Sequence, residues 1–169
     1  KPMTLEKDGR SIEITLHHAG HIAGAVSVGI QSKDERIFFT GDVLFNDQRT
    51  LDGAIPPLEP VDVLITETTR GRSPRNPSRQ RENEIVSLLE ETRQTLSKGG
   101  SVLIPVFALG RMQEMLVVLE EAFRRKAIPN VPVFCSGLGM DLVNHLHEVA
   151  KNSEHLHFNR KVLRKIGAR

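Results

Sequence analysis

Apolar runs alternate with segments of helical periodicity from residue 60 to about residue 150. VDVLIT (61–66), SVLIPVF (101–107) and VPVFC (131–135) have the length and the β-branched content of buried strands. Apolar residues at helical spacing predict helices over about 77–98, 110–126 and 138–150. Strands that are buried on both faces and joined by helices are typical of a parallel sheet, so this part of the chain is predicted to be α/β.

The first third of the chain instead has the pattern of antiparallel strands. SIEITL (11–16), AVSVGIQ (25–31) and RIFFT (36–40) are rich in the residues that favour strands. The last two flank a short polar stretch, 32–35, that suits a turn. We therefore expect a hairpin here.

Composition narrows the class of protein. Apolar residues make up 38% of the chain and charged residues 26%, and no apolar run is as long as a membrane span, so we expect neither disorder nor membrane insertion. The single cysteine, Cys135, cannot form an internal disulfide, and the first residues lack the order of a secretory signal. We expect a cytoplasmic protein. The net charge of +2 does not by itself indicate a nucleic-acid partner.

Three histidines follow the first of these strands. His17, His18 and His21 lie in LHHAGHIAGA, where Gly20 and Gly24 allow side chains and backbone to approach one point. Such a group can bind a metal ion. It can equally be a turn with solvated or hydrogen-bonded histidines, and the spacing alone leaves both readings open.

Two acidic residues follow other predicted strands. RIFFT runs into Gly41-Asp42, and VDVLIT runs into Glu67. The hairpin could bring His21 and Asp42 to the same edge of the sheet, and Glu67 occupies a third strand end. Each acidic side chain can also simply hydrogen-bond to the backbone of a turn or cap that turn. Three acid or imidazole groups at three strand ends nevertheless make a metal site at one edge plausible.

Four motifs together carry a family resemblance. HAGHIAGA, FTGDV, LITETT and IPVFALGRMQEML, in this order, resemble the β-CASP branch of the metallo-β-lactamase superfamily. This branch includes ribonuclease J and the endonuclease that cleaves messenger-RNA 3′ ends. The resemblance spans about residues 11–150, and the IPVFALGRMQE stretch distinguishes it from simple lactamases and glyoxalases.

The resemblance implies a site and a fold. His21 matches a zinc ligand, Asp42 matches the aspartate that bridges two Zn²⁺ ions, and Glu67 matches the acid that opens the β-CASP motifs, so Asp42 and Glu67 are the expected catalytic residues. The implied activity is hydrolysis of RNA phosphodiester bonds by water activated between two metal ions. In fold terms, residues 1–69 would complete a sandwich portion of the lactamase-like core, and 70–169 would begin the parallel α/β domain of the β-CASP type.

Arginines supply candidate phosphate contacts. Arg70, Arg72 and Arg75 lie in a loop with no acidic residue before Glu82. Arg111 lies where a strand-to-helix loop presents backbone N–H groups. The loop arginines could contact RNA or form a solvated segment, and Arg111 could bind phosphate or pair with Glu114.

One departure limits what the chain can do alone. The superfamily motif H-x-H-x-D-H, which supplies most metal ligands, is not found in the sequence. We therefore expect this chain alone to be inactive, and its exposed apolar faces to favour self-association, including a homo-oligomer. Two alternatives stay open: a hydrolase of thioesters, lactams or small phosphodiesters, and an inactive pseudo-nuclease that binds RNA or a partner.

Overall fold

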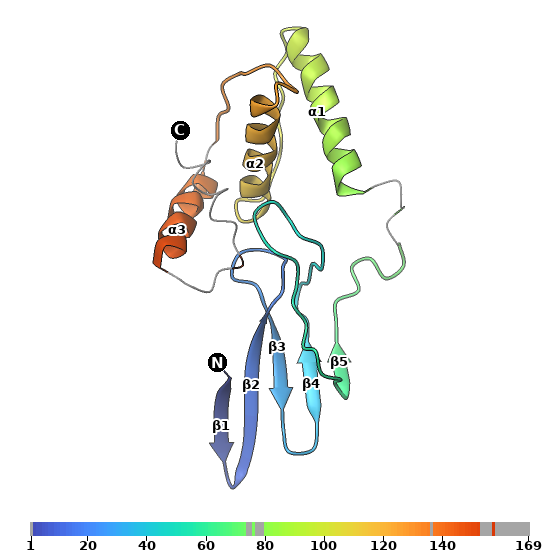
Figure 1. Ribbon diagram of the computed structural model, residues 1–169, viewed down its shortest axis with the longest axis vertical. Helices are drawn as coiled ribbons and strands as arrows, with labels where there is room; N and C mark the ends of the chain where they lie inside the picture. The colour runs from blue at the N-terminus through green and yellow to red at the C-terminus, as the bar shows by residue number, and fades with distance from the viewer. Residues whose placement is uncertain (1, 74–75, 77–79, 136, 153–156, 158–169) are drawn as a thin grey trace. The chain divides into compact units, whose positions relative to one another are not determined.

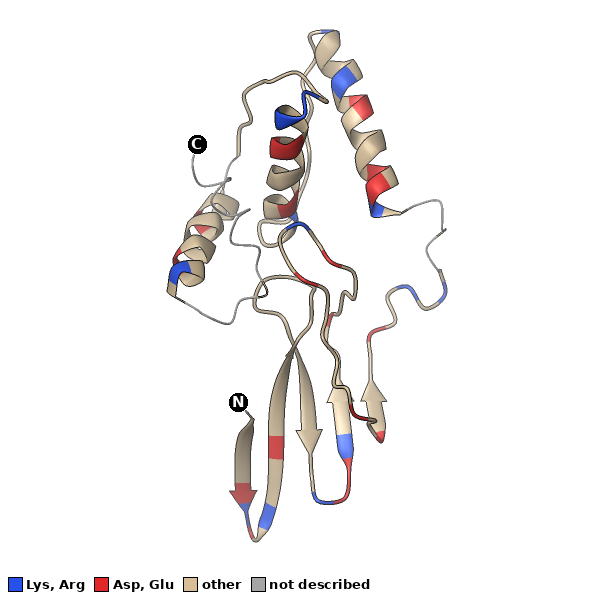
Figure 2. Ribbon diagram, in the orientation of Figure 1, with Lys and Arg blue, Asp and Glu red and all other residues tan. Residues whose placement is uncertain are grey.

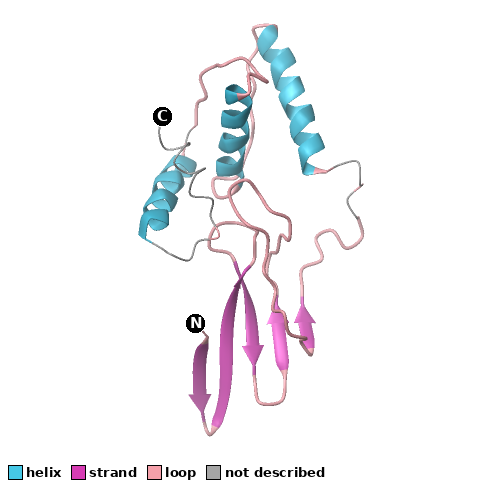
Figure 3. Ribbon diagram, in the orientation of Figure 1, coloured by secondary structure: helices cyan, strands magenta, loops and turns pink. Residues whose placement is uncertain are grey.

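The chain divides into two compact units, Lys1–Thr69 and Arg70–Arg169. The computed structural model describes residues 2–73, 76, 80–135, 137–152 and 157 (Figure 1). The first unit contains a sheet and the second contains helices, as Figure 3 shows. This combination of a mixed five-stranded sheet with three helices confirms the α/β class.

The sheet of the first unit has five strands in sequence order. They are β1 (Met3–Lys7), β2 (Arg10–His18), β3 (Val26–Gln31), β4 (Arg36–Phe39) and β5 (Val63–Ile65). All neighbours are antiparallel except β4 and β5, which are parallel. The expected β3–β4 hairpin is confirmed, and its turn is closed by a hydrogen bond of 2.9 Å from Ser32 N–H to the Glu35 carbonyl oxygen. Strand β1 was not predicted.

The register gives the sheet two different faces. Cross-strand partners share a face, so Leu16, Val28, Phe39 and Ile65 lie together on one of them. Apolar residues of all five strands occupy this face, and several of them are largely exposed. Charged residues are sparse in the middle of the sheet, as Figure 2 shows for β3. An apolar surface of this kind favours contact with further protein surface.

The described residues of the second unit form three helices. They are α1 (Arg81–Ser97), α2 (Arg111–Arg124) and α3 (Leu138–Asn152). The apolar face of α2 is buried, and α3 packs against it so closely that a Cβ on Gly139 would lie 1.8 Å from the sulfur of Met112. The predicted helices are therefore confirmed. Helix α1 begins at Arg81 rather than near residue 77, and residues 77–79 lie outside the described part.

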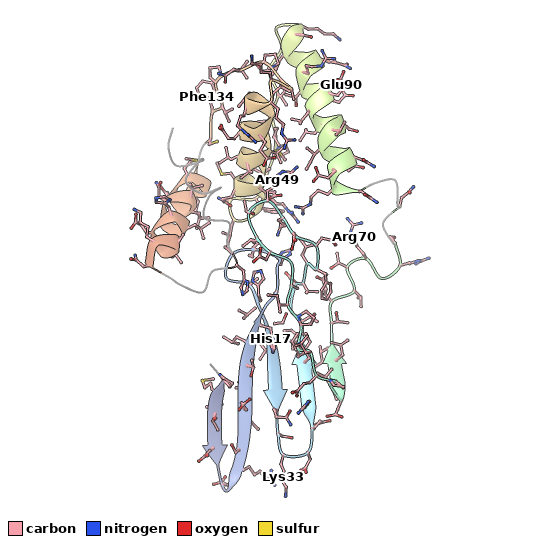
Figure 4. The ribbon with its side chains drawn as sticks, in the orientation of Figure 1. His17, Lys33, Arg49, Arg70, Glu90 and Phe134 are labelled. Carbon is pink, nitrogen blue, oxygen red and sulfur yellow. The ribbon has the colours of Figure 1, made fainter. Side chains whose placement is uncertain are left out.

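The two strands predicted within the second unit do not form. Residues 101–107 and 131–135 carry no strand, and the described residues of this unit include none. Leu103 is 92% exposed and Phe134 is 93% exposed. Figure 4 labels Phe134. A strand requires a neighbour about 4.8 Å away to pair its N–H and C=O groups. The prediction of a parallel sheet here is wrong for the described structure, because no paired neighbour is present among those residues.

Among the described residues, no helix is both long enough and apolar enough to cross a bilayer.

Candidate metal site at the strand ends

The C-terminal ends of β2, β4 and β5 meet at one edge of the sheet of the first unit. His18 at the end of β2 pairs with the first residue of β3, and Phe39 at the end of β4 pairs with Ile65 at the end of β5. The β4–β5 pairing continues past the strands, because Thr40 N–H donates to the Ile65 carbonyl oxygen at 2.9 Å. The segments that carry Asp42 and Glu67 therefore leave the sheet side by side.

A hydrogen bond joins these two segments beyond the sheet. The backbone N–H of Val43, the residue after Asp42, donates to Oε1 of Glu67 at 2.8 Å. A hydrogen bond from the Thr69 side chain, this backbone N–H and the nearby His21 together lower the pKa of Glu67 below its usual value. Hydrogen bonds to a carboxylate and a neighbouring imidazole favour its charged form. Glu67 is therefore an ionised group fixed beside the Asp42 turn.

His21 lies in a compact turn between β2 and β3. Ala19 N–H donates to the Ala25 carbonyl at 3.2 Å, and Ala25 N–H donates to the Ile22 carbonyl at 3.1 Å, so the turn closes on itself. Gly20 has φ of 68°, a conformation that glycine adopts without strain. His21 contributes to the lowered pKa of Glu67, which places the two side chains within electrostatic reach.

His17 and His18 have other roles. Both belong to β2 itself rather than to the loop after it. The ring of His17 packs edge-on against Phe38, with 5.4 Å between the ring centres (Figure 4). Nε2 of His18 is hydrogen-bonded to the Asp52 carbonyl oxygen at 2.9 Å. Of the three histidines, His21 is thus the one in the turn at this edge.

His21, Asp42 and Glu67, the three residues predicted from the sequence, lie in segments that follow strand ends at this edge. Asp42 is exposed, while His21 and Glu67 are half-buried. Among the described residues, no group of three or more His, Cys, Asp or Glu side chains is arranged to hold a metal ion. Imidazole nitrogen and carboxylate oxygen are nevertheless the donors that zinc accepts in proteins. The donor types are therefore suitable, and a metal site at this edge stays a prediction.

The predicted phosphate-binding arginines are assigned to the second unit. Arg70 and Arg72 are exposed in the loop after β5, which Figure 4 shows at Arg70, and Arg75 lies outside the described residues. Arg111 is exposed as the first residue of α2. Glu114 forms an ion pair with Arg81, whose guanidinium lies 2.9 Å from Oε1 of Glu114.

A buried glutamine at the start of α2 was not predicted. Gln113 is 1% exposed, and its Oε1 accepts a hydrogen bond of 2.7 Å from Gly110 N–H. Its Nε2 donates to the carbonyl oxygens of Ala108 at 2.9 Å and Gly139 at 3.2 Å. Gln113 therefore fixes the loop before α2 and links it to the start of α3. A glutamine three residues after the N-cap was the available signal, since that position favours a capping box.

Several known proteins are similar in sequence to this chain. No family model matches the chain. Endoribonuclease YSH1 of Eremothecium gossypii is 39% identical over 131 residues, which cover 75% of this chain and 17% of the relative. An RNase J-like protein of Methanocaldococcus jannaschii is 34% identical over 149 residues, covering 84% and 35% respectively. Transcription termination factor FttA of Methanothermobacter thermautotrophicus is 39% identical over 131 residues, covering 75% and 20%.

These relatives indicate a protein of the metallo-β-lactamase superfamily, which implies metal ions. Within that superfamily, the chain belongs to the β-CASP branch. The chain spans only 17% to 35% of the length of these three relatives.

Proposed function

We propose that this chain is part of a metal-dependent ribonuclease that hydrolyses RNA phosphodiester bonds. The observation that supports it most is the meeting of His21, Asp42 and Glu67 at one sheet edge in a chain of β-CASP type. The names of two relatives, an endoribonuclease and an RNase J-like protein, favour RNA as the substrate. We assign residues 1–69 to the lactamase-like core and residues 70–169 to the start of the β-CASP domain.

In this proposal, His21 and Asp42 contribute ligands to two Zn²⁺ ions. Two closely spaced divalent metal ions, when bound, activate water and stabilise the attacking and leaving oxygens of a phosphodiester. His21 would supply an imidazole nitrogen and Asp42 a carboxylate oxygen. The exposure of the Asp42 side chain supports this assignment, because its oxygens are accessible to an ion.

Glu67 helps to position the two proposed ligands, His21 and Asp42. Its ionised carboxylate accepts the N–H of Val43 and so holds the turn that carries Asp42. His21 also contributes to the lowered pKa of Glu67, so the carboxylate and this imidazole interact electrostatically. A carboxylate beside a metal ligand commonly sets the orientation and the tautomer of a histidine. Glu67 thereby keeps both proposed ligands at the same edge.

Arginines hold the RNA strand. Arg70 and Arg72 are exposed in the loop directly after Glu67, and Arg75 continues this basic segment in the sequence. Arg111 begins α2, where the partial positive charge of a helix N-terminus favours an anion. Contacts of this kind neutralise backbone phosphates without reading the base sequence.

The test is substrate choice by the intact protein that contains this chain. Zinc-supplemented protein is incubated with end-labelled single-stranded RNA, with DNA of the same sequence, and with a β-lactam and a thioester. The proposal predicts metal-dependent cleavage of RNA that a chelator abolishes. Hydrolysis of the lactam or thioester with RNA left intact would contradict it and favour the other hydrolase class. RNA binding without any hydrolysis would favour a pseudo-nuclease.

A further inference from the structure

The turn that carries His21 is held by a segment far from it in the sequence. We call residues 44–54 the bracing segment. Leu44 N–H donates to the Ala19 carbonyl at 2.9 Å, and Ala54 N–H donates to the Leu44 carbonyl at 2.8 Å. A Cβ on Gly20 would lie 2.2 Å from the Leu44 carbonyl oxygen. The bracing segment therefore lies directly against the residue before His21.

One side chain of the bracing segment bonds to the His21 turn itself. Nε2 of Gln48 donates to the carbonyl oxygen of Gly20 at 2.8 Å and to that of His21 at 3.1 Å. Both partners are carbonyl oxygens and can only accept, so the amide nitrogen must face them. A single side chain thus fixes two successive peptide groups, one on each side of the Cα of His21.

Gln48 is itself held in place. Its backbone N–H donates to the Leu51 carbonyl at 2.8 Å, which closes a turn whose residues Thr50 and Leu51 are buried. In the same segment, Oδ1 of Asp47 accepts a hydrogen bond of 2.7 Å from Gly53 N–H. Side chains that must orient a site do so when their own position is fixed by packing and hydrogen bonds. Gln48 meets that condition.

We propose that Gln48 is a positioning residue that orients the imidazole of His21 for metal binding. The inference rests on the proposed function, because it requires His21 to be a ligand. The glycine before His21 has no side chain that restricts its backbone, and the two hydrogen bonds from Gln48 fix the peptide groups on both sides of the His21 Cα. Groups that orient metal ligands in this way typically contribute a factor of about 10–100 to metal affinity.

The test replaces the amide donor without changing its size. In the intact protein, Gln48→Glu places acceptor oxygens against the Gly20 and His21 carbonyls, and Gln48→Met removes the donor with no added charge. Gln31→Glu is the matched control, since the Gln31 side chain is also half-buried and donates to a carbonyl, that of Ser32, at the opposite end of the sheet. Affinity for Co²⁺ is read from visible absorption bands, and thermal unfolding of the metal-free protein is read separately.

We expect Co²⁺ affinity to fall about tenfold or more in both Gln48 variants, with altered band intensities and unchanged affinity in Gln31→Glu. Wild-type affinity in Gln48→Met with an intact fold would overturn the inference while leaving the proposed function standing. A wild-type protein that binds no Co²⁺ would overturn both. If Gln48→Glu does not fold, Gln48→Met decides the outcome.

Discussion

The backbone N–H of Val43 donates to the carboxylate of Glu67 at 2.8 Å, and this bond joins the turn after β4 to the end of β5. It connects residues 24 positions apart, next to the proposed ligand Asp42. Parallel pairing of β4 and β5 makes the bond feasible, because both strands end at the same edge. The candidate site is thus a consequence of sheet topology.

The pH dependence of stability should reveal the charged state of Glu67. Because its pKa in the folded protein is lowered, ionised Glu67 stabilises the fold above the unfolded pKa, which is about 4.3 for a glutamate. That contribution is lost as the pH falls through the folded pKa. We expect wild type to be more stable than Glu67→Gln at pH 6, with the difference shrinking progressively below about pH 4.3 in thermal unfolding.

Thr69→Val provides the companion variant. It removes the side-chain hydrogen bond that contributes most to the lowered pKa of Glu67, so the pH-dependent difference from Glu67→Gln should become smaller. A pH-independent difference between wild type and Glu67→Gln would show that the carboxylate is not stabilised in its charged form.

Gly20 should tolerate no side chain. Gly20→Ala combines a left-handed backbone, which costs a non-glycine residue about 1–2 kcal/mol, with a Cβ 2.2 Å from the Leu44 oxygen and 2.5 Å from the Ala54 nitrogen. Crowding of this kind adds about 1–3 kcal/mol. Gly24→Ala is the control, since its φ is 85° but no atom lies within 4 Å of the added Cβ. Urea unfolding that gives equal losses for both variants would refute the close packing of the bracing segment.

The ion pair between α1 and α2 should contribute measurably to stability. Arg81 and Glu114 approach to 2.9 Å, with 27% and 9% of their side chains exposed. Arg81→Met should destabilise the protein by about 1–3 kcal/mol, because a mostly buried carboxylate loses a charged partner. Arg93→Met should have almost no effect, since Arg93 and Glu90 are exposed on the surface of α1. Similar losses for the two variants in urea unfolding would contradict this difference.

Removal of two arginines should weaken RNA binding in a salt-dependent way. Each phosphate contact contributes about 0.7 to the slope of log affinity against log salt for a single strand, so Arg70→Gln with Arg72→Gln should reduce the slope by about 1.4. The control is Lys7→Gln with Lys33→Gln, which removes the same charge from the opposite end of the sheet. Fluorescence anisotropy at several salt concentrations measures both. An equal change in the two double variants would indicate a general charge effect.

The sequence predicted the structure correctly where the local residue pattern agrees with the topology of the fold. The hairpin spacing placed β3 beside β4, and the acids after RIFFT and VDVLIT followed strands whose ends coincide. The helices could be predicted from the periodic spacing of their apolar residues, because a helix that buries one face carries its apolar residues on that face. No local pattern in the sequence indicates the role of Gln48, since its side chain donates hydrogen bonds to carbonyl groups 27 and 28 positions away in the sequence.

The apolar segments of the second unit show where the prediction from sequence failed. Residues 101–107 and 131–135 have the composition of buried strands, yet neither segment forms a strand in the described structure. The amino-acid composition of a segment can indicate that it favours a strand. Strand pairing also requires another strand within hydrogen-bonding distance. Leu103 and Phe134 therefore remain exposed instead of entering a core.

The most direct measurement is cleavage of end-labelled single-stranded RNA by the intact protein with zinc, compared between wild type and Asp42→Asn. Asp34→Asn, in the exposed turn at the opposite end of the sheet, is the control. We predict that wild type and Asp34→Asn cleave RNA and that Asp42→Asn falls to the level of a chelator-treated sample, with lower zinc content. Undiminished cleavage by a folded Asp42→Asn protein would contradict the assignment of this sheet edge as the metal site.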